Sequence, residues 1–413
     1  MKQASIITIG DELLIGQVID TNSAWIGQKL NEIGIALKER LAVGDDENEI
    51  IRALTETSMH ADIILITGGL GPTKDDITKM TLAKYFHSKL KVDEDVLKQV
   101  TEIFQKANKP ILDSNKSQAK VPENCMVIKN YLGTAPGMWF NEKGKVFISM
   151  PGVPFEMKGM MEEYVLPKLK SDFKDGYIIH KTFLTSGIGE SFLAEKIKTF
   201  ENDLPKNVKL AYLPNLQQVR LRLTTHGANE IELIRLIENL GDQLKTLIGE
   251  FLINDLDCSL EESIGELLKS KNKTISTAES CTGGAIAARI VSVSGSSSYF
   301  RGSIVAYDYE AKSKLLNVPK EVIEQRGAVS EETVINMAKG ALTQFNSDYS
   351  IAVSGIAGPG GGLLNKPVGT VWIAVANTHS VKTKEFHFFK NREQNIQATV
   401  FAALNFMFRF ISD

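Results

Sequence analysis

The sequence predicts an α/β protein of three domains, and three observations lead to this prediction. The chain has 413 residues, which at roughly 100–200 residues per domain suggests two to four domains. In residues 1–170 and 257–413, short apolar runs alternate with stretches of helical periodicity, a pattern typical of parallel sheets covered on both faces. Between them, residues 171–256 have a different rhythm. We therefore expect a three-layer α/β domain, a small α+β domain and a second α/β domain.

Composition and charge indicate a globular chain that does not favour a nucleic-acid or membrane partner. Hydrophobic residues make up 43% and charged residues 23%, and the net charge is −3. Cys125, Cys258 and Cys281 lie far apart without metal spacing, which favours reduced thiols. The N-terminus lacks the pattern of a signal peptide, and no apolar run approaches the roughly 20 residues of a membrane span. We expect a soluble, cytoplasmic protein.

The first domain is predicted to alternate strands with helices. Its apolar runs SIITI and IILIT both end at glycine, as buried strands do. The expected strands are residues 5–9, 63–67 and 146–150, and the expected helices are a segment around residues 24–33 and residues 77–86 and 94–107.

Two loops of this domain carry residues suited to a phosphate and a cation. Gly10, Asp11 and Glu12 follow the first strand, and the run GGLGPTKDD follows the second. Ligands of open α/β sheets lie beyond the carboxyl ends of strands, where glycine amides bind phosphate and carboxylates bind cations. The alternative is that the glycines form tight turns and the aspartates cap helices. The candidate metal ligands are Asp11, Asp75 and Asp76, and the candidate substrate-binding residues are Asn22, Gly69 and Gly71.

The segments GDELLIGQVIDTNS, TGGLGPTKDD and PGVPFEMK resemble the molybdopterin-binding fold as it occurs in the competence/damage-inducible family, CinA. The resemblance covers residues 1–170. It implies a metal-dependent ADP-ribose pyrophosphatase that forms AMP and ribose 5-phosphate with a divalent cation such as Mg, Mn or Co. The residues themselves indicate only a phosphate and a cation.

The middle segment, residues 171–256, reads as a small α+β module. Val219, Leu221 and Leu223 alternate with polar residues, so one face of this strand should be wet. The module resembles a KH-like domain, but its turn reads SGIGES where KH domains that bind nucleic acid carry GxxG. This departure favours a spacer or dimerisation element over RNA binding. The expected strands are residues 177–185, 208–213 and 218–225, the expected helices are residues 190–200 and 229–247, and residues 255–259 are the candidate linker.

The C-terminal domain carries a candidate amidase site. Ser280 lies at a strand-to-helix turn and needs a base, because a serine hydroxyl alone is a poor nucleophile. Lys312 is the better candidate base, since His379 and His387 adjoin no glycine-rich loop, and Tyr307 would assist. The alternatives are that Ser280 caps a helix, Lys312 is a solvated charge, Tyr307 is an ordinary strand aromatic and Cys281 is the nucleophile.

The run SGIAGPGGG is too rich in glycine for a simple turn and suggests backbone close to a phosphate or ribose. A flexible surface loop is the alternative. Arg392, at the predicted start of the last helix, is either a phosphate partner or a surface charge. The candidate substrate-binding residues of this domain are Thr282, Gly283, Gly284, Ser354, Gly355, Ala357, Gly358 and Arg392.

The blocks AESCTGG, RGSIVAYDYEAK, GAVSEET, SGIAGPGGG and KPVGTVW resemble, in this order, the CinA C-terminal domain. The resemblance implies an α/β deamidase that hydrolyses nicotinamide mononucleotide to nicotinic acid mononucleotide and ammonia without a cofactor. Ser280 and Lys312 match the family's proposed catalytic serine and lysine. A bifunctional enzyme of pyridine nucleotide salvage, acting as a homodimer, is therefore expected. The alternative is a nucleotide-sensing protein linked to competence that binds without turnover.

Overall fold

The computed structural model describes residues 2–173, 175–215 and 218–412. The chain forms two compact units, one of Met1–Ile179 with Thr225–Arg235 and one of His180–Thr224 with Leu236–Asp413. The expected mixed α/β class is confirmed. Among the described helices, none is both long and apolar enough to cross a membrane.

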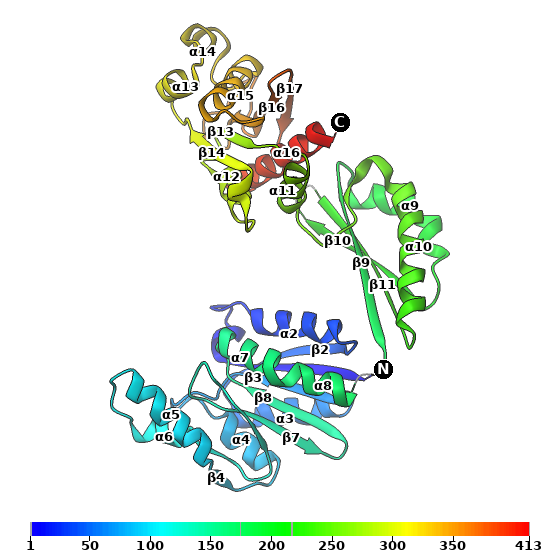
Figure 1. Cartoon of the computed structure of the whole chain (residues 1–413), viewed down its shortest axis with the longest axis vertical. Coiled ribbons are helices and arrows are strands. Elements are labelled where there is room, and N and C mark those ends of the chain that lie inside the picture. Colours follow the sequence, from blue (N-terminus) through cyan, green and yellow to red (C-terminus); the bar gives the residue numbers. More distant parts are fainter. Residues whose placement is uncertain (1, 174, 216–217, 413) are drawn as a thin grey trace. The chain divides into compact units, whose positions relative to one another are not determined.

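The N-terminal domain is built on a six-stranded mixed sheet of order β2-β1-β3-β8-β7-β6 (Figure 1). The first four strands are parallel, and the last two run antiparallel to their neighbours. The strands are β1 (Gln3–Ile9), β2 (Ala36–Val43), β3 (Ile63–Thr67), β6 (Met126–Ile128), β7 (Gly137–Glu142) and β8 (Lys145–Met150). A separate two-stranded ribbon pairs β4 (Leu90–Val92) with β5 (Lys120–Pro122).

The antiparallel edge departs from the parallel sheet that the sequence predicts. Lys143 and Gly144 both have positive φ, 49° and 77°, and such a pair forms the two-residue turn of a hairpin. This turn makes β7 run antiparallel to β8. β2 was also unforeseen, because its charged and half-exposed sequence ALKERLAV lacks the apolar run of a buried strand.

Helices cover both faces of this sheet. One apolar core joins α2, α7 and α8 to the sheet, and another joins α3 and α4 to its opposite face (Figure 1). The chain then passes from α7 through a wider π-helical turn, Met161–Val165, into α8. The helices are α1 (Asp11–Leu14), α2 (Thr21–Glu32), α3 (Glu47–Ser58), α4 (Thr78–Tyr85), α5 (Glu94–Lys106), α6 (Asp113–Ser117), α7 (Pro154–Met160) and α8 (Leu166–Phe173).

The middle segment forms a four-stranded sheet of order β10-β11-β9-β12 with two helices. Along β11, Val219, Leu221 and Leu223 are buried and their neighbours are half-exposed, as the alternation in the sequence predicts. The elements are β9 (Tyr177–Ser186), α9 (Glu190–Asn202), β10 (Val208–Asn215), β11 (Gln218–Gly227), α10 (Glu230–Ile248) and β12 (Leu252–Asn254).

The C-terminal domain is a three-layer sandwich around a five-stranded sheet of order β14-β13-β15-β16-β17. One apolar core joins α13, α14 and α15 to one face, and another joins α11, α12 and α16 to the other. The strands are β13 (Ile275–Glu279), β14 (Phe300–Val305), β15 (Tyr349–Gly355), β16 (Thr370–Asn377) and β17 (Val381–His387). The helices are α11 (Leu260–Ser270), α12 (Ala285–Val291), α13 (Tyr309–Leu316), α14 (Lys320–Arg326), α15 (Glu331–Phe345) and α16 (Arg392–Ser412).

The strand directions of this sheet determine where the candidate site lies. β13 is parallel to both β14 and β15, and β16 and β17 follow in antiparallel pairs. The carboxyl ends of β14, β13, β15 and β17 therefore meet at one edge of the sheet. The candidate residues of this domain lie at these strand ends, in the loops that follow them and in the first turns of α13 and α16.

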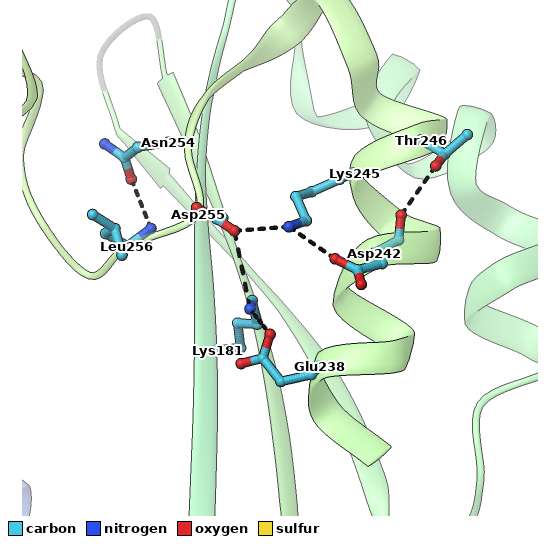
Figure 2. Close-up of polar contacts among 8 residues, drawn as sticks. All are labelled: Lys181, Glu238, Asp242, Lys245, Thr246, Asn254, Asp255 and Leu256. Carbon is cyan, nitrogen blue, oxygen red and sulfur yellow. Dashed lines mark hydrogen bonds and ion pairs between the residues drawn. The ribbon is translucent and has the colours of Figure 1, made fainter. Parts of the chain in front are cut away.

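A network of ion pairs fixes α10 to β9 and to the chain after β12 (Figure 2). Lys245 contacts Asp242 at 2.9 Å and Asp255 at 3.0 Å, and Lys181 lies between Glu238 and Asp255. The hydrogen bond from Lys245 is the main cause that lowers the pKa of Asp255 below its ordinary value. Asp255 is therefore fully charged at neutral pH and joins both lysines.

Replacement of Asp255 by Asn should loosen this part of the chain. Because the Asp255 and Lys245 side chains are about one-third exposed, solvent screens the pair, and we expect a loss of about 1 kcal/mol of local stability. Amide hydrogen exchange of residues 236–248 should then become about five-fold faster. Asp257→Asn is the matched control, because Asp257 is 78% exposed and forms a longer ion pair, 3.5 Å from Arg220. Solvent screens such an exposed pair. Equal exchange in both variants would contradict the role of the network.

Candidate functional site

Ser280 and Lys312, which are separated by 32 positions in the chain, meet at the carboxyl edge of the C-terminal sheet. Ser280 follows β13, and its N–H donates to the Val353 carbonyl of β15 at 3.1 Å. The Nζ atom of Lys312, on α13, lies 3.0 Å from the Ser280 Oγ atom. Gly284 caps α12, which begins at Ala285, so Ser280 does not occupy the helix-capping position. The sequence analysis predicted these two residues as nucleophile and base, and the structure places them in contact.

The Lys312 side chain is buried, with 1% of its surface exposed. Its Nζ atom contacts the carbonyl oxygens of Ala306 at 2.7 Å and Tyr307 at 3.3 Å. Burial lowers the pKa of the amine from its ordinary value of 10.5, because desolvation disfavours the charged form. Lys312 is therefore not a solvated helix charge, and its environment is that of a lysine able to act as a base.

Cys281 lies beside Ser280 but differs from it chemically. Its side chain is buried, and burial raises the pKa of the thiol to about 12. A cysteine nucleophile reacts as the thiolate, which a lowered pKa favours. At neutral pH Cys281 is almost entirely the unreactive thiol, so its environment is that of a packed small side chain.

The Tyr307 phenol is hydrogen-bonded to Arg392 and not to the Ser280–Lys312 pair. Its side chain is 61% exposed, and its hydroxyl accepts a hydrogen bond from Arg392 at 3.1 Å. Tyr307 lies in the loop after β14, which ends at Val305, so it is not a strand aromatic. The Tyr307 atom that contacts Lys312 is the backbone carbonyl. Tyr307 thus contributes to the geometry of the pair through its main chain.

The turn after Ser280 is held from inside by a carboxylate that the sequence analysis did not nominate. Glu279 accepts hydrogen bonds from the Thr282 hydroxyl at 2.7 Å and from the Gly284 amide at 3.1 Å. The Gly283 amide donates to the Ser280 carbonyl at 3.1 Å. The amides of Gly283 and Gly284 and the hydroxyl of Thr282 are therefore engaged within the protein. Gly283 and Gly284 both have positive φ, 62° and 99°, which only glycine adopts at low cost.

The first part of the glycine-rich run, residues 354–358, is held by the protein at several points, whereas residues 359–362 are exposed at the surface. Ser354 is fully buried, and its hydroxyl donates to the Ala328 carbonyl at 2.7 Å. Gly355 ends β15 and pairs with β16. The carbonyl of Ala357 accepts from Asn395 at 3.0 Å, and the carbonyl of Gly358 accepts from Arg392 at 2.7 Å. Arg392 is exposed and fastens this run to Tyr307.

In the N-terminal domain, the glycines after β3 are required by close packing. A Cβ atom on Gly68 would lie 2.1 Å from the Ile9 carbonyl, and one on Gly69 would lie 2.1 Å from the Thr78 hydroxyl. Asn22 is 9% exposed and donates to the Gly152 carbonyl at 2.7 Å, while its side-chain oxygen has no described partner. A Cβ on Gly71 would meet the carboxylate of Asp76. These residues lie at the carboxyl ends of β1, β3 and β8.

Acidic side chains gather at the same edge, and one of them was not nominated from the sequence. Asp11 and Asp45 exchange hydrogen bonds, each backbone N–H donating to the other's carboxylate at 3.2 Å. Burial, with the charges of Asp11, Glu12 and Asp75 nearby, raises the pKa of Asp45. Asp76 accepts from the backbone N–H of Thr73 at 2.9 Å.

The predicted divalent cation would need several oxygen ligands that converge on one point. Within the described residues, no three His, Cys, Asp or Glu side chains converge as the ligands of one metal ion. Asp11 and Asp76 are engaged by backbone amides instead. The described carboxylates therefore do not converge on one point in this arrangement, and a cation bound between them would require their side chains to reorient.

Comparison with known families gives consistent matches along the chain. Residues 5–171 match a model described as a probable molybdopterin binding domain, residues 180–253 the damage-inducible protein CinA KH domain, and residues 257–411 the CinA C-terminal domain. The predicted three-domain layout is thereby confirmed.

Relatives match over almost the whole chain. A CinA-like protein of Flavobacterium psychrophilum is 47% identical over 99% of this chain and 98% of its own, and one of Cytophaga hutchinsonii is 46% identical over the same shares. Among solved structures, competence/damage inducible protein CihA of Agrobacterium tumefaciens is 37% identical over 37% of this chain and 94% of its own, with a TM-score of 0.36. The chain belongs to the CinA family of competence/damage-inducible proteins.

Proposed function

We propose that the C-terminal domain hydrolyses the amide of nicotinamide mononucleotide to give nicotinic acid mononucleotide and ammonia. The observation that carries this proposal is the 3.0 Å contact between the Ser280 Oγ and a buried Lys312 amine whose pKa burial lowers. A serine becomes a nucleophile when a neighbouring base accepts its proton. Membership of the CinA family supports the same reaction class.

Three hydrogen-bond acceptors surround the Nζ atom of Lys312: the carbonyls of Ala306 and Tyr307 and the Oγ atom of Ser280. A charged amine can donate to all three. A neutral amine would keep two of these bonds and turn its lone pair to the Ser280 hydroxyl, and this is the arrangement that the proposed base requires.

The proposed reaction proceeds in two halves. Ser280 Oγ attacks the amide carbon as Lys312 takes its proton, and a tetrahedral oxyanion forms. Lys312 then gives that proton to the amide nitrogen, the C–N bond breaks, and ammonia leaves an acyl-serine. Water attacks the acyl carbon while Lys312 accepts its proton, and return of that proton to Ser280 releases the carboxylate product.

The mononucleotide fits the remaining chemistry of this edge. The exposed guanidinium of Arg392 can pair with a phosphate, and it adjoins the glycine-rich run through Gly358. We propose that Arg392 and this run bind the phosphate and ribose.

Ammonia release distinguishes this enzyme from a nucleotide sensor that binds without turnover. We further propose a cytoplasmic homodimer, which light scattering tests.

We also propose that the N-terminal domain hydrolyses ADP-ribose to AMP and ribose 5-phosphate with a divalent cation. Its support is the gathering of Asp11, Asp45 and Asp75 at the carboxyl edge of a parallel sheet, where the mutual repulsion of carboxylates contributes to the raised pKa of Asp45. A cation would relieve this repulsion.

Variants of Ser280, Lys312 and Cys281 test the nucleophile. Ser280→Ala and Lys312→Ala should each lower kcat for ammonia release by about 10³-fold or more, because the two residues act as one unit. Both variants should still bind nicotinic acid mononucleotide. Cys281→Ser should keep a substantial fraction of the activity. In the native protein, iodoacetamide should label the half-buried Cys258 before Cys281. An inactive Cys281→Ser protein would replace the serine mechanism with a cysteine mechanism.

The pH dependence of the rate tests the base. Since burial lowers the pKa of Lys312, the neutral amine forms at a pH below the ordinary value of 10.5, and kcat/KM should rise with pH through that lowered pKa to a plateau. Lys312→Arg should be inactive throughout, because a guanidinium cannot lose its proton in this range. Lys314→Arg, an exposed change on the same helix, should keep the wild-type profile. A profile that falls over the same range would rule out a neutral lysine base.

The second activity is tested by removing the cation or its candidate ligand. Excess chelator should stop the formation of AMP from ADP-ribose and leave ammonia release unchanged. Asp76→Ala should do the same, whereas Thr73→Val, which removes only a hydroxyl partner of Asp76, should keep much of the AMP formation. Undiminished AMP formation in chelator would refute the role of the metal.

A further inference from the structure

Glu279 is a fully buried carboxylate directly before Ser280, at the end of β13. Both of its oxygens accept several hydrogen bonds within 3.4 Å. The donors are the hydroxyls of Thr277, Thr282 and Ser303 and the backbone amides of Gly284, Ile286 and Ala287. A buried carboxylate is tolerated when donors compensate its lost hydration, and here the compensation comes from both sides of the turn that carries Ser280.

These bonds attach the start of α12 to the strand that precedes it. The three amides belong to Gly284, the cap of α12, and to the first turn of this helix, where N–H groups lack helical partners. Glu279 accepts hydrogen bonds from these amides, so they are not available to a substrate. Five residues of chain, from Ser280 to Gly284, are thereby held between two fixed points.

The same arrangement leaves particular amides uncommitted. The N–H of Ser280 donates to Val353, and that of Gly283 donates to Ser280. Within the described residues, the amide of Thr282 donates to no other group, and the amide of Cys281 donates only to its own thiol, a weak acceptor. Backbone donors next to a nucleophile stabilise the oxyanion only if their positions are fixed before reaction.

We propose that Glu279 is a positioning residue that fixes the Ser280 turn, and with it the amides of Cys281 and Thr282, for attack on the substrate amide. This role rests on the proposed amidase function. Glu279 does not act as a base, because its two oxygens already accept from six groups. A carboxylate is needed rather than an amide, since a glutamine would turn an NH₂ group toward backbone N–H donors.

The test compares Glu279→Gln and Glu279→Asp with the wild type in ammonia release from nicotinamide mononucleotide. A displacement of about 1 Å at a reacting centre costs on the order of 100-fold in rate, and we expect such a loss of kcat for Glu279→Gln. Glu279→Asp keeps the charge with a shorter reach and should lie between the two. The affinity for nicotinic acid mononucleotide, measured by calorimetry, should stay within about two-fold of the wild type in both variants.

The matched control is Glu262→Gln. Glu262 also accepts a backbone N–H at a helix start of this domain, from Ser259 at the start of α11, so its loss removes a carboxylate cap away from Ser280 and should leave kcat unchanged. The rising limb of the pH profile should stay at the same pH in Glu279→Asp, because Lys312 sets it.

Three results would overturn the inference. Wild-type kcat in Glu279→Gln would remove the need for the carboxylate, and parallel loss of product affinity in both variants would indicate a merely structural role. A rising limb that moves in Glu279→Asp would make Glu279 part of the proton transfer. A wild-type protein that releases no ammonia would instead contradict the proposed function itself.

Discussion

The burial of the Lys312 amine beside Ser280 is the constraint on which the C-terminal site depends. A charged amine taken out of water is costly, so a buried lysine needs acceptors or loses its proton readily. The chain after β14 supplies acceptors through the carbonyls of Ala306 and Tyr307. Asp308 then caps α13 and starts the helix that carries Lys312 back to this loop. The parallel pairing of β14 with β13 places the whole loop next to Ser280.

Two buried ionisable groups flank the nucleophile, and the number of their partners separates their roles. Glu279 has six donors around two oxygens, so neither oxygen is available to accept a proton from a substrate. Lys312 has two carbonyl acceptors and one reactive neighbour, so a proton can move along only one of its contacts. The hydrogen bonds of Glu279 stabilise the turn on one side of Ser280, and burial lowers the pKa of Lys312 on the other side.

The sequence was sufficient for the fold class and for the central pair, because glycine-rich turns after apolar strands are strong local signals. Ser280 is followed by such a turn, at Gly283 and Gly284, whereas Lys312 was chosen because it lies shortly after a strand and no histidine adjoins a glycine-rich loop. The orientation of Tyr307 could not be predicted, since it depends on whether the main chain or the phenol of that loop faces inward. Asp45 and Glu279 were not nominated because a lone carboxylate has no spacing pattern. The available signal for Glu279 was a charge inside ISTAE, a segment that is buried throughout.

Both α/β domains place ionisable side chains at the carboxyl ends of their strands, but the environments of these side chains differ. At the C-terminal site, Glu279 and Lys312 are buried and hydrogen-bonded within the protein, so their geometry exists before any ligand binds. At the N-terminal edge, Asp11 and Asp75 are exposed, and their repulsion contributes to the raised pKa of Asp45. Preorganised dipoles suit an amide, whose reaction creates a charge that the protein must stabilise. Clustered carboxylates suit a pyrophosphate only when a cation stands between like charges, which is why the proposed hydrolysis of ADP-ribose is tied to a divalent cation.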